Sequence, residues 1–250
     1  MSHPRPAPAG AQVVLRAIRL LKAFTAEEPE WLPAELAARF DLTKTTTHRL
    51  LGALTSEGML MRDGAGVYRL GPAAIALGTQ ALRTNDLRAT VRPHLRSLAN
   101  ATGETATLEV LVDDTVLVAD EAFGGHLLAA TAETGTRWPL HVTSSGKALL
   151  AAMPAEERQR YYNLGLPSFT EVTVTDPVVL EEELGSVRER GWATAIEELE
   201  TGYVAVGVAL RGPLIDAALA VGGPKERLLS RLQEIGELLC RTAAAIEAGD

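Results

Sequence analysis

Residues 43–51, Thr-Lys-Thr-Thr-Thr-His-Arg-Leu-Leu, decide the fold at the front of this chain. Thr43 suits the N-cap of a helix that ends near Gly58. Helical spacing turns Thr47 and the leucines that follow it inward and leaves the outer face to Lys44, Thr45, Thr46, His48 and Arg49. Together with Thr43 at the helix start, these five residues are the DNA-binding candidates of the helix. A cation and several hydroxyls at a helix N-terminus suit contacts with DNA phosphates and base edges. The stretch predicts a helix that reads DNA, with Arg49 placed to grip a guanine edge.

The segments around this helix predict a winged helix-turn-helix over residues 11–72. Apolar residues at helical spacing indicate a first helix that begins after Gly10, and residues 33–40 indicate a short second helix that starts at a proline. Residues 59–62 and 67–70 flank a glycine-rich turn and indicate a β-hairpin, the wing. Taken alone, the third helix is equally well explained as a surface helix capped by threonines; its neighbours favour DNA binding. Arg62 beside the hairpin turn is a further DNA-binding candidate, unless it is an ordinary solvated strand end.

Length and composition favour two folded domains. The chain has 250 residues, of which 46% are apolar and 22% charged, and this excludes a disordered chain or a small disulfide-stapled one. The net charge is −8, but residues 1–90 hold 11 lysines and arginines against 8 acidic residues, whereas residues 91–250 hold 13 against 24. A mildly basic N-terminal part followed by an acidic C-terminal part is expected if only the N-terminal part binds a polyanion.

Residue usage also bears on compartment and cofactors. Cys240 is the single cysteine, so an intrachain disulfide is excluded and a reducing compartment is expected. No stretch approaches 18 consecutive apolar residues, and residues 1–10 form a proline-rich leader that we expect to be disordered. The five histidines lack metal-binding spacing. We therefore expect a cytoplasmic protein with no membrane contact, no metal and no cofactor.

Residues 73–89 predict an alanine-rich linker helix, and residues 90–250 predict a second, larger domain. Apolar, β-branched runs there indicate strands at residues 105–112, 116–121, 127–131, 193–197, 204–211 and 217–222. Helices are expected at residues 144–153, 155–162, 177–190 and 224–248. About six strands with intervening helices indicate an α+β domain with an antiparallel sheet.

Several short sequence motifs, spread over nearly the whole chain, resemble those of the IclR family of bacterial transcriptional regulators. The first is residues 42–51 in the DNA reader, and the others are residues 139–141 (Pro-Leu-His), 146–151 (Gly-Lys-Ala-Leu-Leu-Ala), 188–192 (Arg-Glu-Arg-Gly-Trp), Glu197-Glu198, Gly202 and 222–224 (Gly-Gly-Pro). The resemblance implies a winged-helix domain, a linker helix and a C-terminal effector-binding domain with a GAF-like or profilin-like fold. It also implies a homodimer, or a homotetramer built as a dimer of dimers, that binds palindromic double-stranded operator DNA. Such a regulator represses or activates metabolic genes in response to a small organic effector.

The resemblance further implies a set of effector-binding positions. Relatives that bind glyoxylate or pyruvate hold it beside the Gly-Lys-Ala word and on the late strands, and the matching positions here are Leu127, Ala130, Trp138, Ser144, Ser145, Ala195, Tyr203, Ala205, Ala220 and Gly222. The four positions on the late strands that are alanine or glycine here carry an acidic side chain, a cysteine and serines in those relatives. We therefore expect a roomier pocket for an aromatic or largely apolar effector, with Ser144 and Ser145 offering hydroxyls or a helix N-terminus to an anionic head group.

Four residues near these positions have plain structural explanations as well. Trp138 is equally well explained as an ordinary core aromatic, and His141 is more simply a hydrogen-bonded structural residue than a ligand of the effector. Glu197 and Glu198 are expected to support the fold rather than to contact the effector.

Two alternatives use the C-terminal domain differently, as a small-molecule-binding enzyme or as a protein-interaction module. Ser144 and Lys147 match the Ser-x-x-Lys word of penicillin-recognising enzymes, but the companion motifs are missing from the sequence. A phosphate-binding loop would need a glycine at His141 and a hydroxyl residue at Ala148. We therefore expect no enzyme, and operator binding is the property that separates a regulator from an interaction module.

Overall fold

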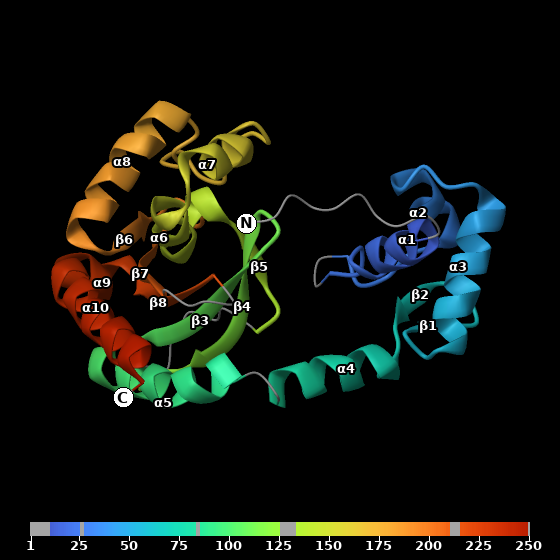
Figure 1. The fold of residues 1–250 in the computed structure, drawn as a ribbon, viewed down its shortest axis with the longest axis horizontal. Helices are drawn as coiled ribbons and strands as arrows, with labels where there is room; N and C mark the ends of the chain where they lie inside the picture. The colour runs from blue at the N-terminus through green and yellow to red at the C-terminus, as the bar shows by residue number, and fades with distance from the viewer. Residues whose placement is uncertain (1–10, 26–27, 84–85, 126–133, 211–215, 250) are drawn as a thin grey trace. The chain divides into compact units, whose positions relative to one another are not determined.

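A computed structural model describes residues 11–25, 28–83, 86–125, 134–210 and 216–249. The chain divides into two compact units, residues 1–84 and residues 85–250 (Figure 1). The expected leader, residues 1–10, lies outside the described residues, as does the whole of the strand expected at residues 127–131.

The first unit has three helices followed by a hairpin, as the sequence predicts. Its elements are α1 (Gln12–Leu21), α2 (Pro33–Arg39), α3 (Lys44–Ser56), β1 (Leu60–Arg62), β2 (Tyr68–Leu70) and α4 (Pro72–Arg83). The antiparallel hairpin pairs Leu60 with Leu70 and Arg62 with Tyr68. Buried leucines from the helices and the wing form one core, which fixes α3 against α1 and α2. The winged helix-turn-helix is confirmed.

The second unit is an antiparallel sheet covered by helices on both faces. Its elements are α5 (Asp86–Thr102), β3 (Thr105–Val112), β4 (Thr115–Ala122), β5 (Arg137–Pro139), α6 (Ser144–Ala152), α7 (Ala155–Tyr162), α8 (Pro177–Arg190), β6 (Ala193–Ile196), β7 (Tyr203–Leu210), β8 (Ala217–Pro224), α9 (Lys225–Leu228) and α10 (Leu232–Ala248). Within the described residues the strand order is β5-β4-β3-β8-β7-β6, and every neighbouring pair is antiparallel. This confirms the predicted α+β class.

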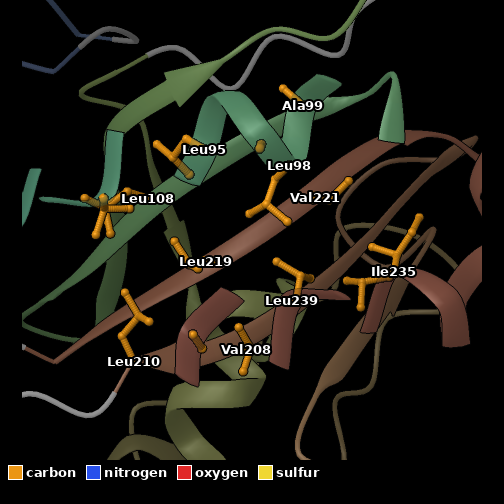
Figure 2. Packing of buried hydrophobic residues seen from close by; sticks show 14 of the residues in the cluster. Leu95, Leu98, Ala99, Leu108, Val208, Leu210, Leu219, Val221, Ile235 and Leu239 are labelled. Carbon is orange, nitrogen blue, oxygen red and sulfur yellow. The ribbon is translucent and has the colours of Figure 1, made fainter. Parts of the chain in front are cut away.

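Strand alternation gives the two faces of the sheet different characters. Large apolar side chains of β3, β7 and β8 pack against α5 and α10, as Figure 2 shows for Leu108, Val208 and Leu219. The intervening residues of β7 and β8 are alanine and glycine, and α6 lies against that face. The small residues matter for function because they let a helix N-terminus come close to the strands.

The structure differs from the sequence prediction at two places in this unit. The edge strand β5 occupies residues 137–139, where the sequence analysis predicts no strand. Its pairing of Trp138 with Val116 is a long-range contact that no local pattern reports. The helix expected at residues 224–248 is broken into α9, a 3₁₀ turn at Leu229–Arg231 and α10. Arg231 donates to the carbonyl oxygen of Thr102 at 2.9 Å, which holds the turn against the end of α5.

Candidate functional site

The N-terminus of α3 is built by hydrogen bonds among threonines. Thr43 has an extended backbone and its hydroxyl accepts the amide of Thr46 at 3.3 Å, so it is the N-cap that the sequence predicts. The hydroxyls of Thr43 and Thr46 are 2.9 Å apart. Thr47 is fully buried and its hydroxyl donates to the carbonyl oxygen of Thr43 at 3.1 Å. The hydroxyls of Thr43, Thr46 and Thr47 are therefore engaged in ordering the helix start, and this leaves fewer hydroxyls free for DNA than the sequence alone indicates.

The outer face of α3 carries the exposed cationic residues. Lys44, Thr45, His48 and Arg49 are exposed, whereas Thr46 is half-buried. The first turn has no acidic side chain. Because a helix N-terminus presents backbone N–H groups and a positive dipole end, this face attracts phosphate oxygens.

The wing places Arg62 and Asp63 in different environments. Arg62 is exposed and its guanidinium lies 5.8 Å from the ring centre of Tyr68. One carboxylate oxygen of Asp63 accepts the amides of Ala65 and Val67, both at 2.9 Å. The acidic residue at the wing tip is therefore the acceptor that closes the turn.

The structure brings together most of the expected effector positions on the late strands. Ala195 pairs with Ala205, and Ala205 pairs on its other side with Gly222. Ala220 lies next to Gly207 in the same register and on the same face. The alanines are buried, and together they make a floor of small residues across β6, β7 and β8.

Ser144 and Ser145 join this floor from α6. Both are about 1% exposed, and Thr143 caps the helix by accepting the amide of Gly146 at 3.1 Å. A Cβ atom at Gly207 would lie 2.6 Å from the backbone nitrogen of Ser145, so only glycine allows α6 to begin so close to β7.

The aromatic positions of the expected pocket lie apart. Tyr203 lies across Gly222, because a Cβ atom there would stand 1.9 Å from its hydroxyl oxygen. Burial and then the carboxylates of Glu109 and two further glutamates raise the pKa of Tyr203, so its hydroxyl stays a donor. Trp138 lies on β5, and β4, β3 and β8 separate that strand from β7. It is half-buried against the cluster around α6, as an ordinary core aromatic would be. Leu127 and Ala130 lie outside the described residues.

Glu109 was not expected at this site. It lies on β3, is 7% exposed and accepts hydrogen bonds from Thr107 at 2.8 Å and from the hydroxyl of Ser145. In the sequence, Glu109 stands out only as the charged residue of a predicted strand that is otherwise uncharged. That pattern indicates a special position but does not show which face of the sheet the side chain occupies.

His141 is held on both ring nitrogens. Nδ1 is 2.8 Å from the hydroxyl of Tyr161 and Nε2 is 2.9 Å from the carbonyl oxygen of Pro167. The carbonyl can only accept, so Nε2 carries the proton and the tyrosine hydroxyl donates to Nδ1. Burial lowers the pKa of His141 and keeps the ring neutral. These contacts agree with the structural role expected for it.

The glutamates and Lys147 form ion pairs that hold segments together. Glu197 accepts the amide of Gly202 at 2.9 Å and pairs with Lys225. Lys147 is fully buried, and its ammonium lies 2.8 Å from Glu183 and 2.6 Å from Glu198. Because Lys147 is committed to two carboxylates, it is poorly placed as the base of a Ser-x-x-Lys enzyme.

In the described part of the chain, no group of three or more histidine, cysteine, aspartate or glutamate side chains is arranged to hold a metal ion. Among the described helices, none has both the length and the apolar character needed to span a bilayer.

Known families match both units. The family described as IclR helix-turn-helix domain matches residues 13–64, and the family described as bacterial transcriptional regulator IclR C-terminal matches residues 79–248. A helix-turn-helix-type transcriptional regulator of Mycobacterium tuberculosis is 34% identical over 241 residues, which cover 96% of this chain and 92% of the relative. The transcriptional repressor IclR of Escherichia coli is 30% identical, with 96% and 90% of the two chains covered.

Solved structures show the same architecture. An IclR transcriptional regulator from Alicyclobacillus acidocaldarius is 28% identical, with a TM-score of 0.83 and coverage of 95% of this chain and 98% of that one. An IclR homologue from Microbacterium hydrocarbonoxydans in complex with 4-hydroxybenzoate is also 28% identical, with a TM-score of 0.75 and coverage of 94% and 98%. The curated relatives are transcriptional regulators and not enzymes, as the sequence predicts for this chain. With both domains matched in order, this chain belongs to the IclR family of DNA-binding bacterial transcriptional regulators.

Proposed function

We propose that this regulator binds a palindromic operator through paired α3 helices and that a small organic effector, bound at the start of α6, changes that binding. The exposed, acid-free N-terminus of α3 carries the first part of the proposal. Lys44, Thr45, His48 and Arg49 contact the DNA, with the helix start ordered by Thr43 and Thr46. Arg62 follows the phosphate backbone from the wing.

Dimerisation of the chain explains why its operator should be palindromic. On α1, Val13, Val14 and Ile18 are 47%, 58% and 46% exposed, which leaves an apolar helix face without cover in the single chain. Two such faces packed together would place two copies of α3 symmetrically, and a two-fold symmetric reader needs a two-fold symmetric site. We propose a homodimer as the minimal DNA-binding form, acting in the cytoplasm, and a dimer of dimers where two operators are held.

The effector proposal rests on the small-residue floor and on a relative. Ala195, Ala205 and Ala220 put no large side chain on this face of the sheet, and the two serines of α6 lie beside them, so we place the aromatic or largely apolar body of the effector against these alanines. The homologue that was solved with 4-hydroxybenzoate shows that an aromatic molecule can occur in a member of this family. Effector binding then shifts the arrangement of the paired reader units.

Operator binding by charge-deletion variants tests the DNA-reading face. Lys44→Ala and Arg49→Ala should each weaken binding to the promoter of the regulator's own gene by roughly tenfold, because a base contact contributes about 1–3 kcal/mol to the free energy of binding. Fluorescence anisotropy with labelled promoter DNA measures the affinity at fixed salt. Arg160→Ala, which removes an exposed arginine from α7 in the other unit, is the matched control. Unchanged affinity in both α3 variants would contradict the assigned face.

A further inference from the structure

Glu109 is a buried carboxyl group on the floor of the proposed effector site. It lies on β3, and its neighbour across the β3–β8 pair is Ala218. Thr107, one step along the same face of β3, pairs with Ala220 of the floor. Its contact with the hydroxyl of Ser145 brings it to the first turn of α6. Glu109 therefore stands where the small-residue floor and the helix N-terminus meet.

The hydrogen bonds of Glu109 come from hydroxyl groups. Thr107 donates to one carboxylate oxygen at 2.8 Å and Ser145 donates to the other. Each oxygen of a carboxylate can accept a second hydrogen bond, so both keep an open acceptor position. Among the described residues no lysine, arginine or histidine contacts this carboxylate, and the nearby Lys147 is already bound to Glu183 and Glu198.

A buried carboxylate without a cation is costly to keep ionised. Burial raises the pKa of Glu109, and the hydrogen bonds from Ser145 and Thr107 offset only part of that rise. A positively charged group arriving beside it would favour the ionised form and would gain an interaction strengthened by the low dielectric of the site.

We propose that the effector of this regulator carries a protonated amine that pairs with Glu109, while its apolar body lies on the small-residue floor at Ala205 and Ala220, beside the ring of Tyr203 that covers Gly222. The assignment rests on the proposed function, because it takes the start of α6 as the effector site. Thr107 and Ser145 hold the carboxylate in place, and their hydroxyls are not offered to the ligand. The amine donates to the open acceptor positions of both carboxylate oxygens.

This chemistry differs from the anionic head group that the two serines alone suggest. The hydroxyl of Ser145 is already committed to Glu109, and a ligand carboxylate at the start of α6 would stand next to a second carboxylate. Two like charges in one site cannot both stay ionised without a large penalty. The proposal therefore expects a cationic effector for this chain in place of an acid such as the 4-hydroxybenzoate found with the Microbacterium homologue.

Matched probes of opposite charge test the proposal on the full-length chain. Benzylamine and 4-hydroxybenzylamine are compared with benzoate and 4-hydroxybenzoate, which keep the ring and reverse the charge. Thermal unfolding is followed at rising millimolar concentrations of each probe. We expect both amines to raise the midpoint and both acids to leave it unchanged. Stabilisation by the acids, or no stabilisation by either amine, overturns the proposal, and this comparison needs no variant.

Glu109→Gln links the response to the residue. The variant keeps the size of the side chain and removes its charge, so the apparent affinity for the amines should fall at least tenfold. Glu156→Gln, an exposed glutamate on α7, is the control and should respond like wild type. An E109Q response equal to that of wild type overturns the assignment. Operator binding is also measured on the same samples without any probe. If wild type does not bind the operator, the proposed function fails. If wild type binds the operator but does not respond to the amines, only the Glu109 assignment fails.

Discussion

At the scale of single residues, Lys147 shows that the Gly-Lys-Ala motif at residues 146–148 stabilises the fold. Its ammonium is fully buried and bonds to Glu183 on α8 and to Glu198 after β6. One cation therefore joins three segments that are far apart in sequence. Burial raises the pKa of Glu198, and the contact with Lys147 opposes that rise.

Removal of this cation should destabilise the second unit strongly. Lys147→Met leaves the buried carboxylate of Glu198 and the half-buried one of Glu183 without their shared cation, at a cost of about 3–5 kcal/mol in the free energy of unfolding. Urea denaturation followed by circular dichroism measures the change. The double variant with Glu198→Gln should recover part of the loss, because one of the two charges is gone. A loss below about 1 kcal/mol for the single variant would show that the triad contributes little.

His141 should make stability depend on pH. Burial lowers its pKa in the folded chain, whereas the unfolded chain has the ordinary value of about 6.5. Between these two values the unfolded chain binds the extra proton, so the free energy of unfolding falls as the pH drops below about 6.5. Glu109 and Glu198 have raised pKa values and act in the opposite direction.

The comparison of wild type with His141→Gln isolates this contribution. Denaturant titrations at several pH values between about 7 and 5 should show a steeper loss of stability in wild type than in the variant. Parallel profiles would mean that the imidazole titrates alike in the folded and unfolded chains.

Prediction from sequence succeeds for residues whose role is local. Thr43 was identified as a cap because capping needs only a hydroxyl at the start of a helix, and the structure confirms it. Glu109 was missed because its meaning depends on Ser145, which is 36 residues away in sequence and joined to it only by the packing of α6 on the sheet. The prediction that Ser144 and Ser145 lie beside the late strands rests on the family resemblance, because the hydrophobic pattern of the sequence gives no information about that contact.

At the scale of elements, Gly236 shows why α10 contains a glycine where an alanine would make a better helix. A Cβ atom there would lie 2.4 Å from the indole ring of Trp192. The guanidinium of Arg190 also lies over the indole ring, 4.3 Å from its centre. The indole thus contacts both the backbone of α10 and a cation.

Alanine at this position should therefore lower stability. Gly236→Ala gains helix propensity, but displacement of the indole outweighs the gain, and we expect a net loss of about 1–2 kcal/mol by urea denaturation. Gly185→Ala on α8 is the matched control, because its Cβ atom would meet only the end of Arg188 at 3.9 Å. That variant should gain up to about 1 kcal/mol. Equal effects of the two substitutions would mean that Trp192 moves aside freely.

Elements with a strong local signal are those that the sequence located well. The helices at residues 144–152 and 177–190 and the wing strands fall within a residue or two of their expected ends. The short strand β5 has no apolar alternation over its three residues and exists because β4 accepts it at the sheet edge. The break before α10 depends on a contact with the end of α5, which again is not local.

At the scale of the whole molecule, the acidic net charge does not oppose DNA binding. The excess of acidic residues belongs to residues 91–250, and the exposed cations of α3 belong to the other unit. Binding of a duplex then depends on a small local charge, and the pairing of two readers supplies the affinity that a single one lacks.

Disruption of the exposed face of α1 should separate dimerisation from folding. Ile18→Glu puts a charge into the apolar face and should shift the chain toward monomer in sedimentation experiments, with at least a tenfold loss of operator affinity. Leu229→Glu is the control, since it places the same charge at a 43% exposed leucine in the other unit. If I18E stays dimeric and binds the operator normally, α1 is not the pairing element.

The glycine at position 207 has a mechanical consequence. Because nothing but backbone separates the start of α6 from β7, a ligand that pushes this helix also pushes the strand. On its other face β7 carries Val206 and Val208, which are packed in the cluster that includes α10. A displacement of less than an ångström at the serines is thus transmitted through one strand to the C-terminal helix on the opposite side of the sheet, because a close-packed interior has little room to absorb it.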